Sequence, residues 1–549
     1  MNKVVKNKTY LLLVSVFVAV CLALTPWLNV DSLVIPKVVI LFCAALYFLP
    51  ILLFDIKNFL SNRTFKILFI LSCLIIIQMV LVIITSPAPW EQQVFGKSGR
   101  GLGFITEISI IIIMLVASRY VEFDKTKILI NGVLLSAFIS SAYAIVQRYG
   151  YDIFDWYTRT NGIIGTLGNP NFQSAFAAIA IIPAALYFAG TPLKNKLLSI
   201  LMFFTFAFTI YICQSTQGYL VSAFSLCMIL LLYFWYRHKL IFVGISTTVF
   251  TFGLIVIAGM LNIGPLASVL YKVSIQSRGE FFRSAITGAK DNPLFGVGID
   301  SFGDFSSYYK NAKDASGINE YTDNAHNYFL NYAVNGGYLL ALLYLALTIL
   351  TIICFFRFQR TIGKFDINAA SIISLWVGFQ AQSMISPGTI PLLLLGFLLN
   401  GTIIGLSVWG LSNRYIFPTL QTNLFKPFSY FLFFIAIIVI YPYFNVDRMQ
   451  LKSLKTGDGL LAIASAKAYP ESSLRYQRIG NTLLESNLLP QSLEVGRSAV
   501  EFNPNSISAW GLILANPSAT IEERRRAVEE ILRIDPFNKD VLELQKLIK

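Results

Sequence analysis

The chain of 549 residues contains only two histidines, and one of them stands in a position suited to chemistry. His326 lies in the stretch TDNAHNYFL, where a polar and aromatic segment turns into an apolar one. A neutral imidazole accepts a proton from a hydroxyl group, which is the usual role of a general base. Asp323 could orient the ring if the backbone between the two residues is helical. The other histidine, His238, lies in the basic cluster YRHK, which indicates a solvated group.

A set of basic residues falls in or beside segments that the charge pattern described below assigns to the outer side of a membrane. They are Lys97, Arg100, Arg148, Arg159, Lys272, Arg278 and Arg283. Because a guanidinium group binds phosphate oxygens through two parallel hydrogen bonds, the arginines indicate an anionic ligand. Contact with lipid headgroups is the alternative explanation for any single one of them. Glu107 lies inside an apolar segment, where a carboxylate is costly, and we expect Arg100 or an arginine of a long loop to pair with it.

These residue types exclude several kinds of site. Two histidines cannot build a histidine-rich metal centre, and no pair of carboxylates with ligand spacing accompanies His326. The sequence contains no Walker loop, no G-x-S-x-G motif and no H-E-x-x-H motif. Arginines can hold a diphosphate as a leaving group, while a histidine takes the proton of an incoming hydroxyl. The residues therefore predict transfer of a group from a lipid diphosphate to an alcohol, with no metal and no other cofactor.

The elements that must position these residues are membrane-spanning helices. The chain is 56% hydrophobic and 13% charged, whereas soluble domains carry about 25% charged residues. Runs of about 20 apolar residues, the length that crosses the hydrocarbon core of a bilayer, recur along the sequence. We predict an all-α, polytopic helical bundle with thirteen spans, near residues 9–29, 33–54, 66–86, 104–118, 128–147, 171–190, 195–213, 219–236, 240–262, 327–356, 369–386, 390–411 and 428–446.

The distribution of basic residues predicts the orientation of this bundle. A cluster of lysines precedes the first span, and every second connection after it is basic, which places the N-terminus in the cytoplasm. Connections on the other side, such as SPGT at 386–389, are poor in Lys and Arg. With an odd number of spans, the C-terminus then lies outside the cytoplasmic membrane, as do two long loops at about 148–170 and 263–326. All six cysteines lie in or at the end of spans, so no disulfide framework is expected.

The membrane domain, residues 1–446, is followed by a tail of different composition, residues 447–549. Pro470, Pro504 and Pro536 close successive helical patterns at spacings of 34 and 32 residues, which is typical of tetratricopeptide-type repeats. Such repeats form a concave surface, so the tail predicts a protein partner or acceptor on the outer side. The alternative is that its helices only cover the outer face of the membrane domain.

One region resembles the signature of a known family. The run SRGEFFRSAITGAKDNPLFGVGIDSFGDFSSYY, followed by HNYFLNYAVNGGYLL, is similar to that of the O-antigen ligase and polymerase family. In that family a serine-arginine pair, a D-x-P-L-x-G-x-G turn, a long outer loop, a His-Asn or His-Ser pair and a later glycine follow in this order. The matching positions here are Ser277-Arg278, Asp291 to Gly298, His326-Asn327 and Gly337. FGKSGRGLGFITE at 95–107 and GTLGNPNFQSA at 165–175 also resemble one branch of the family, and the likeness extends over roughly residues 60–410.

The resemblance implies a fold of the GT-C glycosyltransferase type and an undecaprenyl-diphosphate-linked glycan as donor. It also implies metal-independent transfer on the outer face of the cytoplasmic membrane, with Arg278 binding the diphosphate and His326 acting as base. A second arginine of the family, in a T-x-S-R-G motif, is replaced by Gln217 in CQSTQGYL. Glutamine can donate hydrogen bonds but cannot neutralise a phosphate. Either Arg100, Arg148 or Arg159 substitutes for that arginine, or this branch uses a different donor or acceptor.

The sequence thus predicts a membrane glycosyltransferase that ligates or polymerises a surface glycan. His326 and Arg278 are the catalytic candidates, and the substrate-binding candidates are Arg100, Glu107, Arg148, Arg159, Gln217, Arg283 and Asn327. Three acceptors remain open, namely a lipid A core, another glycan chain and a protein hydroxyl, the last of which would make the chain a protein O-oligosaccharyltransferase. A transporter or flippase of a lipid-linked glycan is the alternative function. Such proteins have internal repeats and charges near the membrane midplane, whereas no duplicated hydropathy pattern is visible here and the charges gather at one face, which favours an enzyme.

Overall fold

The computed structural model describes residues 2–157, 162–190, 193–260, 262–270, 273–316, 321–409 and 422–548. Over these residues the secondary structure is helical and contains no strand, so the predicted all-α, polytopic class is confirmed. A helix occupies each of the thirteen predicted spans. These helices are α1 (Asn2–Leu22), α2 (Ile35–Phe54), α4 (Arg63–Thr85), α6 (Phe104–Tyr120), α7 (Thr126–Arg148), α8 (Pro170–Gly190), α9 (Leu193–Ile212), α10 (Thr216–Arg237), α11 (Lys239–Met260), α16 (Tyr328–Ile362), α17 (Ile367–Ser383), α18 (Ile390–Trp409) and α19 (Thr422–Thr456).

Nine helices in the described part of the chain are long and apolar enough to cross a membrane. They correspond to α2, α4, α7, α8, α10, α11, α16, α18 and α19. The helices of the other four predicted spans are α1, α6, α9 and α17, which are shorter or less apolar than these nine over their described residues. For example, α6 and α17 have 17 residues each. The protein is therefore a multi-pass membrane protein.

The centre of the bundle is formed by α18, which packs directly against α6. A Cβ atom at Gly401 would lie 2.2 Å from the carbonyl oxygen of Met114, and one at Gly405 would lie 2.2 Å from that of Ser118. Two glycines four residues apart thus let the two backbones touch, as small residues do at helix crossings within membranes. Because the pairing is parallel, the segments that precede α6 and α18 lie next to each other at one end of the bundle.

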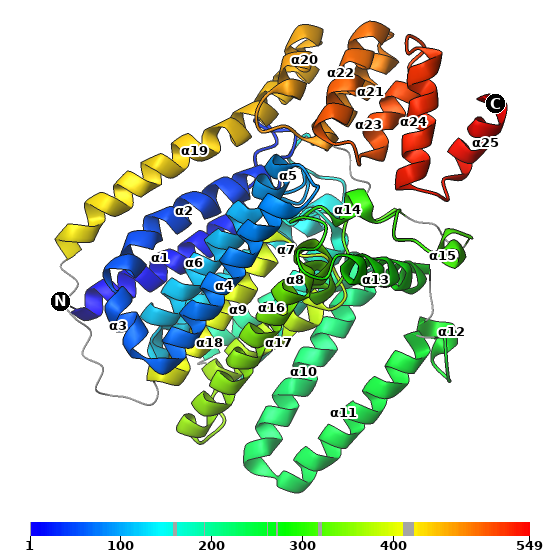
Figure 1. Ribbon diagram of the computed structural model, residues 1–549. Helices are drawn as coiled ribbons and strands as arrows, with labels where there is room; N and C mark the ends of the chain where they lie inside the picture. The colour runs from blue at the N-terminus through cyan, green and yellow to red at the C-terminus, as the bar shows by residue number, and fades with distance from the viewer. Residues whose placement is uncertain are drawn as a thin grey trace.

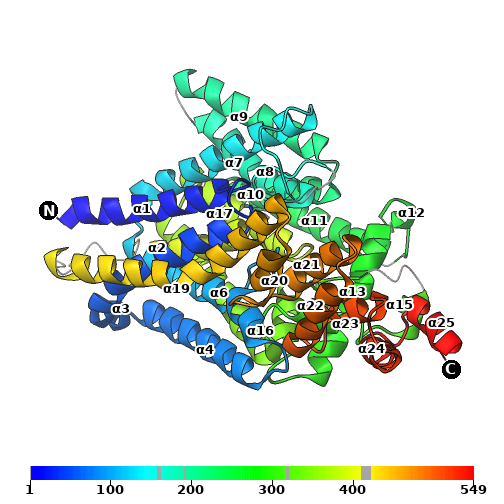
Figure 2. The same cartoon turned by 90° about the horizontal axis from the view of Figure 1, so that it is seen from above.

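The connecting helices of the long loop gather at that same end. Figure 1 shows α13 (Val273–Asp291), α14 (Phe302–Phe305) and α5 (Trp90–Phe95) at the end of the bundle opposite to the N-terminus. The view from above shows the N-terminus on one side, and α12 (Ala267–Leu270), α15 (Ala312–Ser316) and the tail on the other (Figure 2). The short helices α3 (Ile56–Ser61) and η1 (Phe123–Lys125) complete the membrane domain. The two predicted outer loops and the tail therefore share one end.

The tail is a row of helices that begins where α19 ends. Its helices are α20 (Gly459–Lys467), α21 (Ser473–Glu485), α22 (Leu489–Phe502), α23 (Ile507–Ala515), α24 (Ile521–Ile534) and α25 (Lys539–Ile548). Two small apolar cores hold them together, one around Tyr476 and one around Trp510. A tetratricopeptide-type repeat stays a prediction for this row of helices.

Polar and aromatic contacts fix the tail to the loop end of the bundle. The hydroxyl oxygens of Ser98 and Ser472 lie 2.6 Å apart, and the ring centroids of Trp90 and Tyr469 lie 5.8 Å apart in a stacked arrangement. The side-chain amide of Asn503 also donates a hydrogen bond of 3.0 Å to a carboxylate of the long loop. The tail therefore covers the end of the bundle at which the candidate residues gather (Figure 1).

Candidate active site

The glycine-rich turn from Asp291 to Gly298, which follows α13, packs against a break in α16. At Gly337 the helix is interrupted by a residue with φ +80°. A Cβ atom there would lie 2.3 Å from the carbonyl oxygen of Leu294, so this close approach requires glycine. The freed Tyr338 N–H donates to the carbonyl oxygen of Pro293 at 2.8 Å, and the Gln78 side-chain amide donates to that of Leu294 at 2.7 Å. The turn thereby fixes α13, which carries Arg278, relative to the start of α16, which follows His326.

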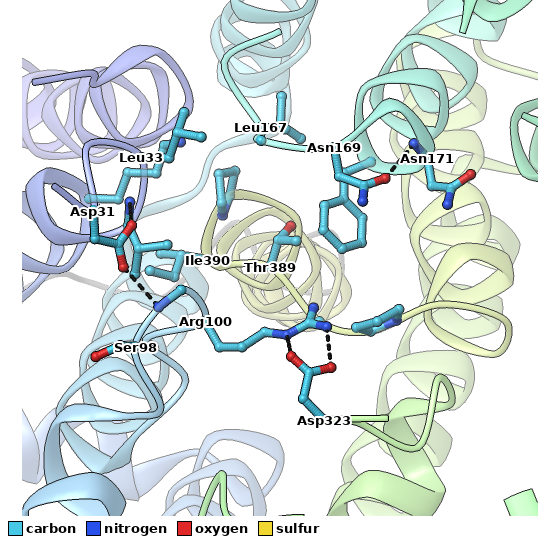
Figure 3. A pocket seen from close by; sticks show the side chains of 18 of the residues that line it. Asp31, Leu33, Ser98, Arg100, Leu167, Asn169, Asn171, Asp323, Thr389 and Ile390 are labelled. Carbon is cyan, nitrogen blue, oxygen red and sulfur yellow. Dashed lines mark hydrogen bonds and ion pairs between the residues drawn. The ribbon is translucent and has the colours of Figure 1, made fainter. Parts of the chain in front are cut away.

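Arg278 and His326 line a common cavity of about 400 Å³. Figure 3 shows labelled residues of its lining, which come from separate connecting segments of the bundle. These segments are residues 30–34 before α2, 98–100 before α6, 167–169 before α8, 323–326 before α16 and 386–389 before α18, and α13 and α21 complete the wall. The parallel packing of α6 and α18 explains why two of the segments meet here. A site made of such distant parts of the sequence depends on the whole bundle.

His326 faces this cavity as a neutral base. Its backbone adopts φ +53°, and its N–H donates to the side-chain oxygen of Asn324 at 2.9 Å. The imidazole lies beside the ring of Phe281, with 5.1 Å between the ring centroids, and its Nδ1 has no hydrogen-bond partner within the described residues. Burial lowers the pKa of His326 to about 4, with help from the positive charges of Arg100 and Arg278. At neutral pH the imidazole is therefore free to accept a proton.

Arg278 reaches the cavity from the first half of α13. Burial lowers the pKa of its guanidinium, which nevertheless keeps its charge at neutral pH. Its side chain has no ion-pair or hydrogen-bond partner among the residues that the structure describes. An unpaired, partly buried arginine of this kind favours an anionic ligand, because such a ligand offsets the cost of its desolvation.

Arg100 lies in the same lining but already has an acidic partner. Its Nε donates to Asp323 Oδ2 at 2.8 Å and its Nη2 donates to Oδ1 at 2.6 Å, as the dashed lines in Figure 3 show. Although burial opposes ionisation of Asp323, the charge of Arg100 lowers the pKa of this carboxyl to about 2. The condition for Asp323 to orient the ring of His326 is not met, because the backbone before His326 is not helical and both carboxylate oxygens bind Arg100.

Residues 201–345 match the family model described as O-antigen ligase. This segment is similar to O-antigen ligases. The matched segment runs from α9 into α16 and includes Arg278, the glycine-rich turn and His326. The match supports a membrane protein that ligates or polymerises glycans. A search of curated proteins found no match to the chain.

Glu107 is buried near the start of α6 and does not line the cavity. The hydroxyl groups of Tyr328 and Tyr332 donate to its two carboxylate oxygens, each at 2.8 Å. The prediction that Arg100 or an arginine of the long loop pairs with Glu107 is wrong, because the two tyrosines of α16 satisfy the carboxylate instead. Glu107 therefore fixes the first turns of α16 to α6.

Four of the remaining candidates, Asn327, Arg148, Arg283 and Gln217, do not line the cavity. Asn327 caps α16 by accepting a hydrogen bond of 3.1 Å from the Leu330 N–H, so it supports the segment that carries His326. Arg148 is exposed at the end of α7, and Arg283 pairs with a carboxylate of α15. The buried side-chain amide of Gln217 donates a hydrogen bond to the side-chain oxygen of Gln382. The last candidate, Arg159, lies outside the described residues.

Two cationic residues of the lining were missed from the sequence. Lys37, in the first turn of α2, donates from Nζ to the carbonyl oxygen of Thr166 at 2.5 Å. A lysine in an apolar span is costly, and this signal could have identified it. Arg478 comes from α21 of the tail, and no local pattern in the sequence distinguishes it from other arginines of the tail.

A second cavity adjoins this one at Asp323, the ion-pair partner of Arg100. That cavity has a volume of about 670 Å³ and lies between the tail and the α14 region. Both cavities share Ser98 and Asp323 in their linings. Hydroxyl and amide side chains are frequent in the second lining, namely Ser98, Ser473, Gln477, Asn505, Ser506 and Ser508. The candidate site therefore adjoins a second cavity with a polar lining.

Proposed function

We propose that this protein transfers a glycan from an undecaprenyl-diphosphate-linked donor to a hydroxyl acceptor. The observation that carries the proposal is the presence of an uncharged histidine and an unpaired arginine in one cavity. His326 would take the proton of the acceptor, and Arg278 would hold the diphosphate. The match of residues 201–345 to the O-antigen ligase family supports the same chemistry.

The proposed reaction is one displacement at the first carbon of the donor sugar. The acceptor oxygen forms a bond to this carbon while the bond between the carbon and the diphosphate oxygen breaks. The electron pair of the broken bond stays on the diphosphate, whose growing negative charge Arg278 stabilises. The proton of the acceptor hydroxyl moves to the imidazole of His326. In this proposal α13, the glycine-rich turn and α16 together bring Arg278 and His326 to the same cavity.

Arginine supplies the charge stabilisation in this proposal, so transfer is expected to be independent of metal ions. The positive-inside pattern supports a site on the outer face of the cytoplasmic membrane, because the cavity lies at the end opposite to the lysine-rich N-terminus. The acceptor can be a lipid A core, a growing glycan or a protein hydroxyl. A partner or acceptor protein that docks on the tail also stays a prediction.

The experiment that tests this function is a transfer assay with the purified full chain in detergent. Undecaprenyl-diphosphate glycan is the donor, each acceptor class is offered in turn, and EDTA is present throughout. We expect the lipid-linked glycan to be consumed and an acceptor conjugate to form at the same rate with and without EDTA. Mass spectrometry of the product identifies the acceptor.

Two results would contradict the proposal in different ways. Binding of the donor without consumption, with every acceptor class, would favour the alternative function of a transporter or flippase. Activity that EDTA abolishes and a divalent cation restores would contradict the metal-independent mechanism while leaving the transferase in place.

The pKa of His326 leads to a separate prediction about pH. Because the imidazole must be uncharged to act as a base, activity is lost as the pH falls through its pKa, which is about 4. We therefore expect kcat/KM, which reports the free enzyme, to stay level from pH 7 down to about pH 5. Since the chain has only two histidines, NMR of protein labelled with ¹³C-histidine gives a direct measurement, and His238→Ala assigns the two signals. Titration of His326 near pH 6.5 would contradict this prediction.

A further inference from the structure

The tail places an arginine in the wall of the active-site cavity. Arg478 lies in the middle of α21, whose inward face packs the buried residues Tyr476, Ile479 and Leu483 into the core of the tail. Its side chain instead lines the cavity that also contains Arg278 and His326. The lining of the cavity therefore includes a residue of the tail, which lies outside the matched segment, residues 201–345.

The position of Arg478 is fixed by contacts on both sides of it. The residue before α21, Ser472, lies 2.6 Å from Ser98 through their hydroxyl oxygens, and Ser98 belongs to the segment that carries Arg100. The side-chain amide of Asn503, which follows α22, binds Asp304 at 3.0 Å. Because both contacts join the tail to the loops of the membrane domain, α21 is held against the cavity rather than merely near it.

Arg478 has no carboxylate of its own to pair with. No hydrogen bond or ion pair of its side chain occurs within the part of the chain that the structure describes. Burial raises the pKa of Asp31, and the positive charge of Arg478 partly offsets this increase. The carboxylate of Asp31 instead accepts the N–H groups of Gly99 at 2.8 Å and of Val34 at 3.3 Å, and it forms no ion pair with Arg478 among the described residues.

The balance of charge in the lining shows what is left for a ligand. Four cationic side chains and two carboxylates face the cavity, and these are Lys37, Arg100, Arg278 and Arg478 against Asp31 and Asp323. Arg100 is neutralised by Asp323, and Lys37 donates to a backbone carbonyl. The two guanidinium groups that remain unpaired in the described lining are those of Arg278 and Arg478. A ligand with two adjacent anionic groups matches this arrangement, since each guanidinium can bind one of them in a bidentate manner.

We propose that Arg478 binds the donor diphosphate together with Arg278, so that the tail completes the donor site. The inference rests on the proposed function and adds to it a substrate-binding role for the tail. Each phosphoryl group of a diphosphate diester bears a negative charge, whereas a monophosphate ester offers only one phosphoryl group. Arg478 is therefore the residue that distinguishes the two ligands, and Arg278 is needed for both.

The test measures binding of short prenyl phosphates to the purified full chain in a non-ionic detergent. Farnesyl diphosphate and farnesyl monophosphate are the probes, and calorimetry gives the dissociation constants. We expect Arg478→Gln to weaken binding of the diphosphate by at least about tenfold, the usual effect of losing one charged hydrogen-bonded contact. Binding of the monophosphate should change by less than about twofold, and Arg478→Lys should restore part of the loss. A thermal melt checks that each variant is folded.

Matched variants separate a ligand contact from a general effect of charge. Arg525→Gln removes an exposed arginine of α24 that does not line the cavity, and it should bind both probes as the wild type does. An excess of phosphatidylglycerol should not displace farnesyl diphosphate, which excludes a lipid headgroup as the ligand of Arg478. Displacement of the probe by phosphatidylglycerol would overturn the proposal.

The outcomes also distinguish this inference from the proposed function. If Arg278→Gln weakens both probes but Arg478→Gln keeps the full preference for the diphosphate, the donor site stands and the role of Arg478 is wrong. An equal loss for both probes in Arg478→Gln would assign Arg478 a structural role only. If the wild type binds neither probe, the proposed donor is wrong and the inference falls with it.

Discussion

Replacing His326 by alanine is expected to abolish measurable glycan transfer while leaving donor binding intact. Removing a general base costs about 100- to 10,000-fold in rate, because the acceptor hydroxyl then has to lose its proton to water. The imidazole packs beside Phe281, and no hydrogen bond of the ring occurs within the described residues, so its loss should leave the cavity in place. The measurement is the initial rate of donor consumption, with the dissociation constant of the donor determined in parallel.

Two further variants make this result specific. The backbone of His326 has φ +53°, a conformation that asparagine adopts more easily than alanine. His326→Asn should therefore fold at least as well as His326→Ala and be equally inactive, because an amide is not a base. His238→Ala removes the only other histidine, which is exposed at the end of α10, and should keep full activity. Transfer at the wild-type rate by His326→Asn would contradict the mechanism.

The second large effect is expected at Arg278. Arg278→Gln removes the unpaired charge that we propose stabilises the leaving diphosphate, and loss of one such donor typically costs about 100- to 1,000-fold in rate, or about 3 kcal/mol. Unlike the histidine variants, it should also weaken binding of the donor, because the charge is present on the diphosphate before the reaction begins. Arg278→Lys keeps the charge but not the bidentate geometry, so an intermediate rate is expected. Rates and donor affinities of the three proteins are compared in the same assay.

The control for Arg278 lies on the same helix. Lys290 is an exposed residue of the last turn of α13, outside the cavity, so Lys290→Gln removes one positive charge without touching the site. It should keep wild-type rate and affinity. If Lys290→Gln and Arg278→Gln lose activity to the same degree, the effect belongs to the net charge of the helix and the proposed contact with the diphosphate is wrong.

Much of the fold was predictable because each membrane helix can be recognised from one continuous apolar run in the sequence. Each apolar run of sufficient length forms a helix, and the loops that the charge pattern groups together lie at one end of the bundle. The order of motifs around Arg278, Gly337 and His326 was also readable, and the structure gives its physical reason. The glycine-rich turn has to fit into the break of α16, so neither partner can change alone.

The pairing of charges was not predictable, because it depends on contacts between distant segments. Arg100 and Asp323 are more than 200 residues apart and neutralise each other, which removes Arg100 as a free cation. Glu107 finds two tyrosines instead of an arginine. Arg478 looks like one more polar residue of a helical tail until the tail is placed on the bundle. Only the assembled structure shows which positive charges remain unpaired.

The way in which the tail is attached affects the thermodynamics of substrate binding. α19 is one helix, Thr422–Thr456, that begins in the membrane domain and ends just before α20, which starts at Gly459. A flexible linker would let the tail sample many orientations, and each binding event would have to overcome that loss of conformational entropy. With a continuous helix and the contacts of Ser472 and Asn503, this loss occurs once, when the protein folds. In the proposed role of Arg478, its guanidinium is therefore preorganised for the diphosphate.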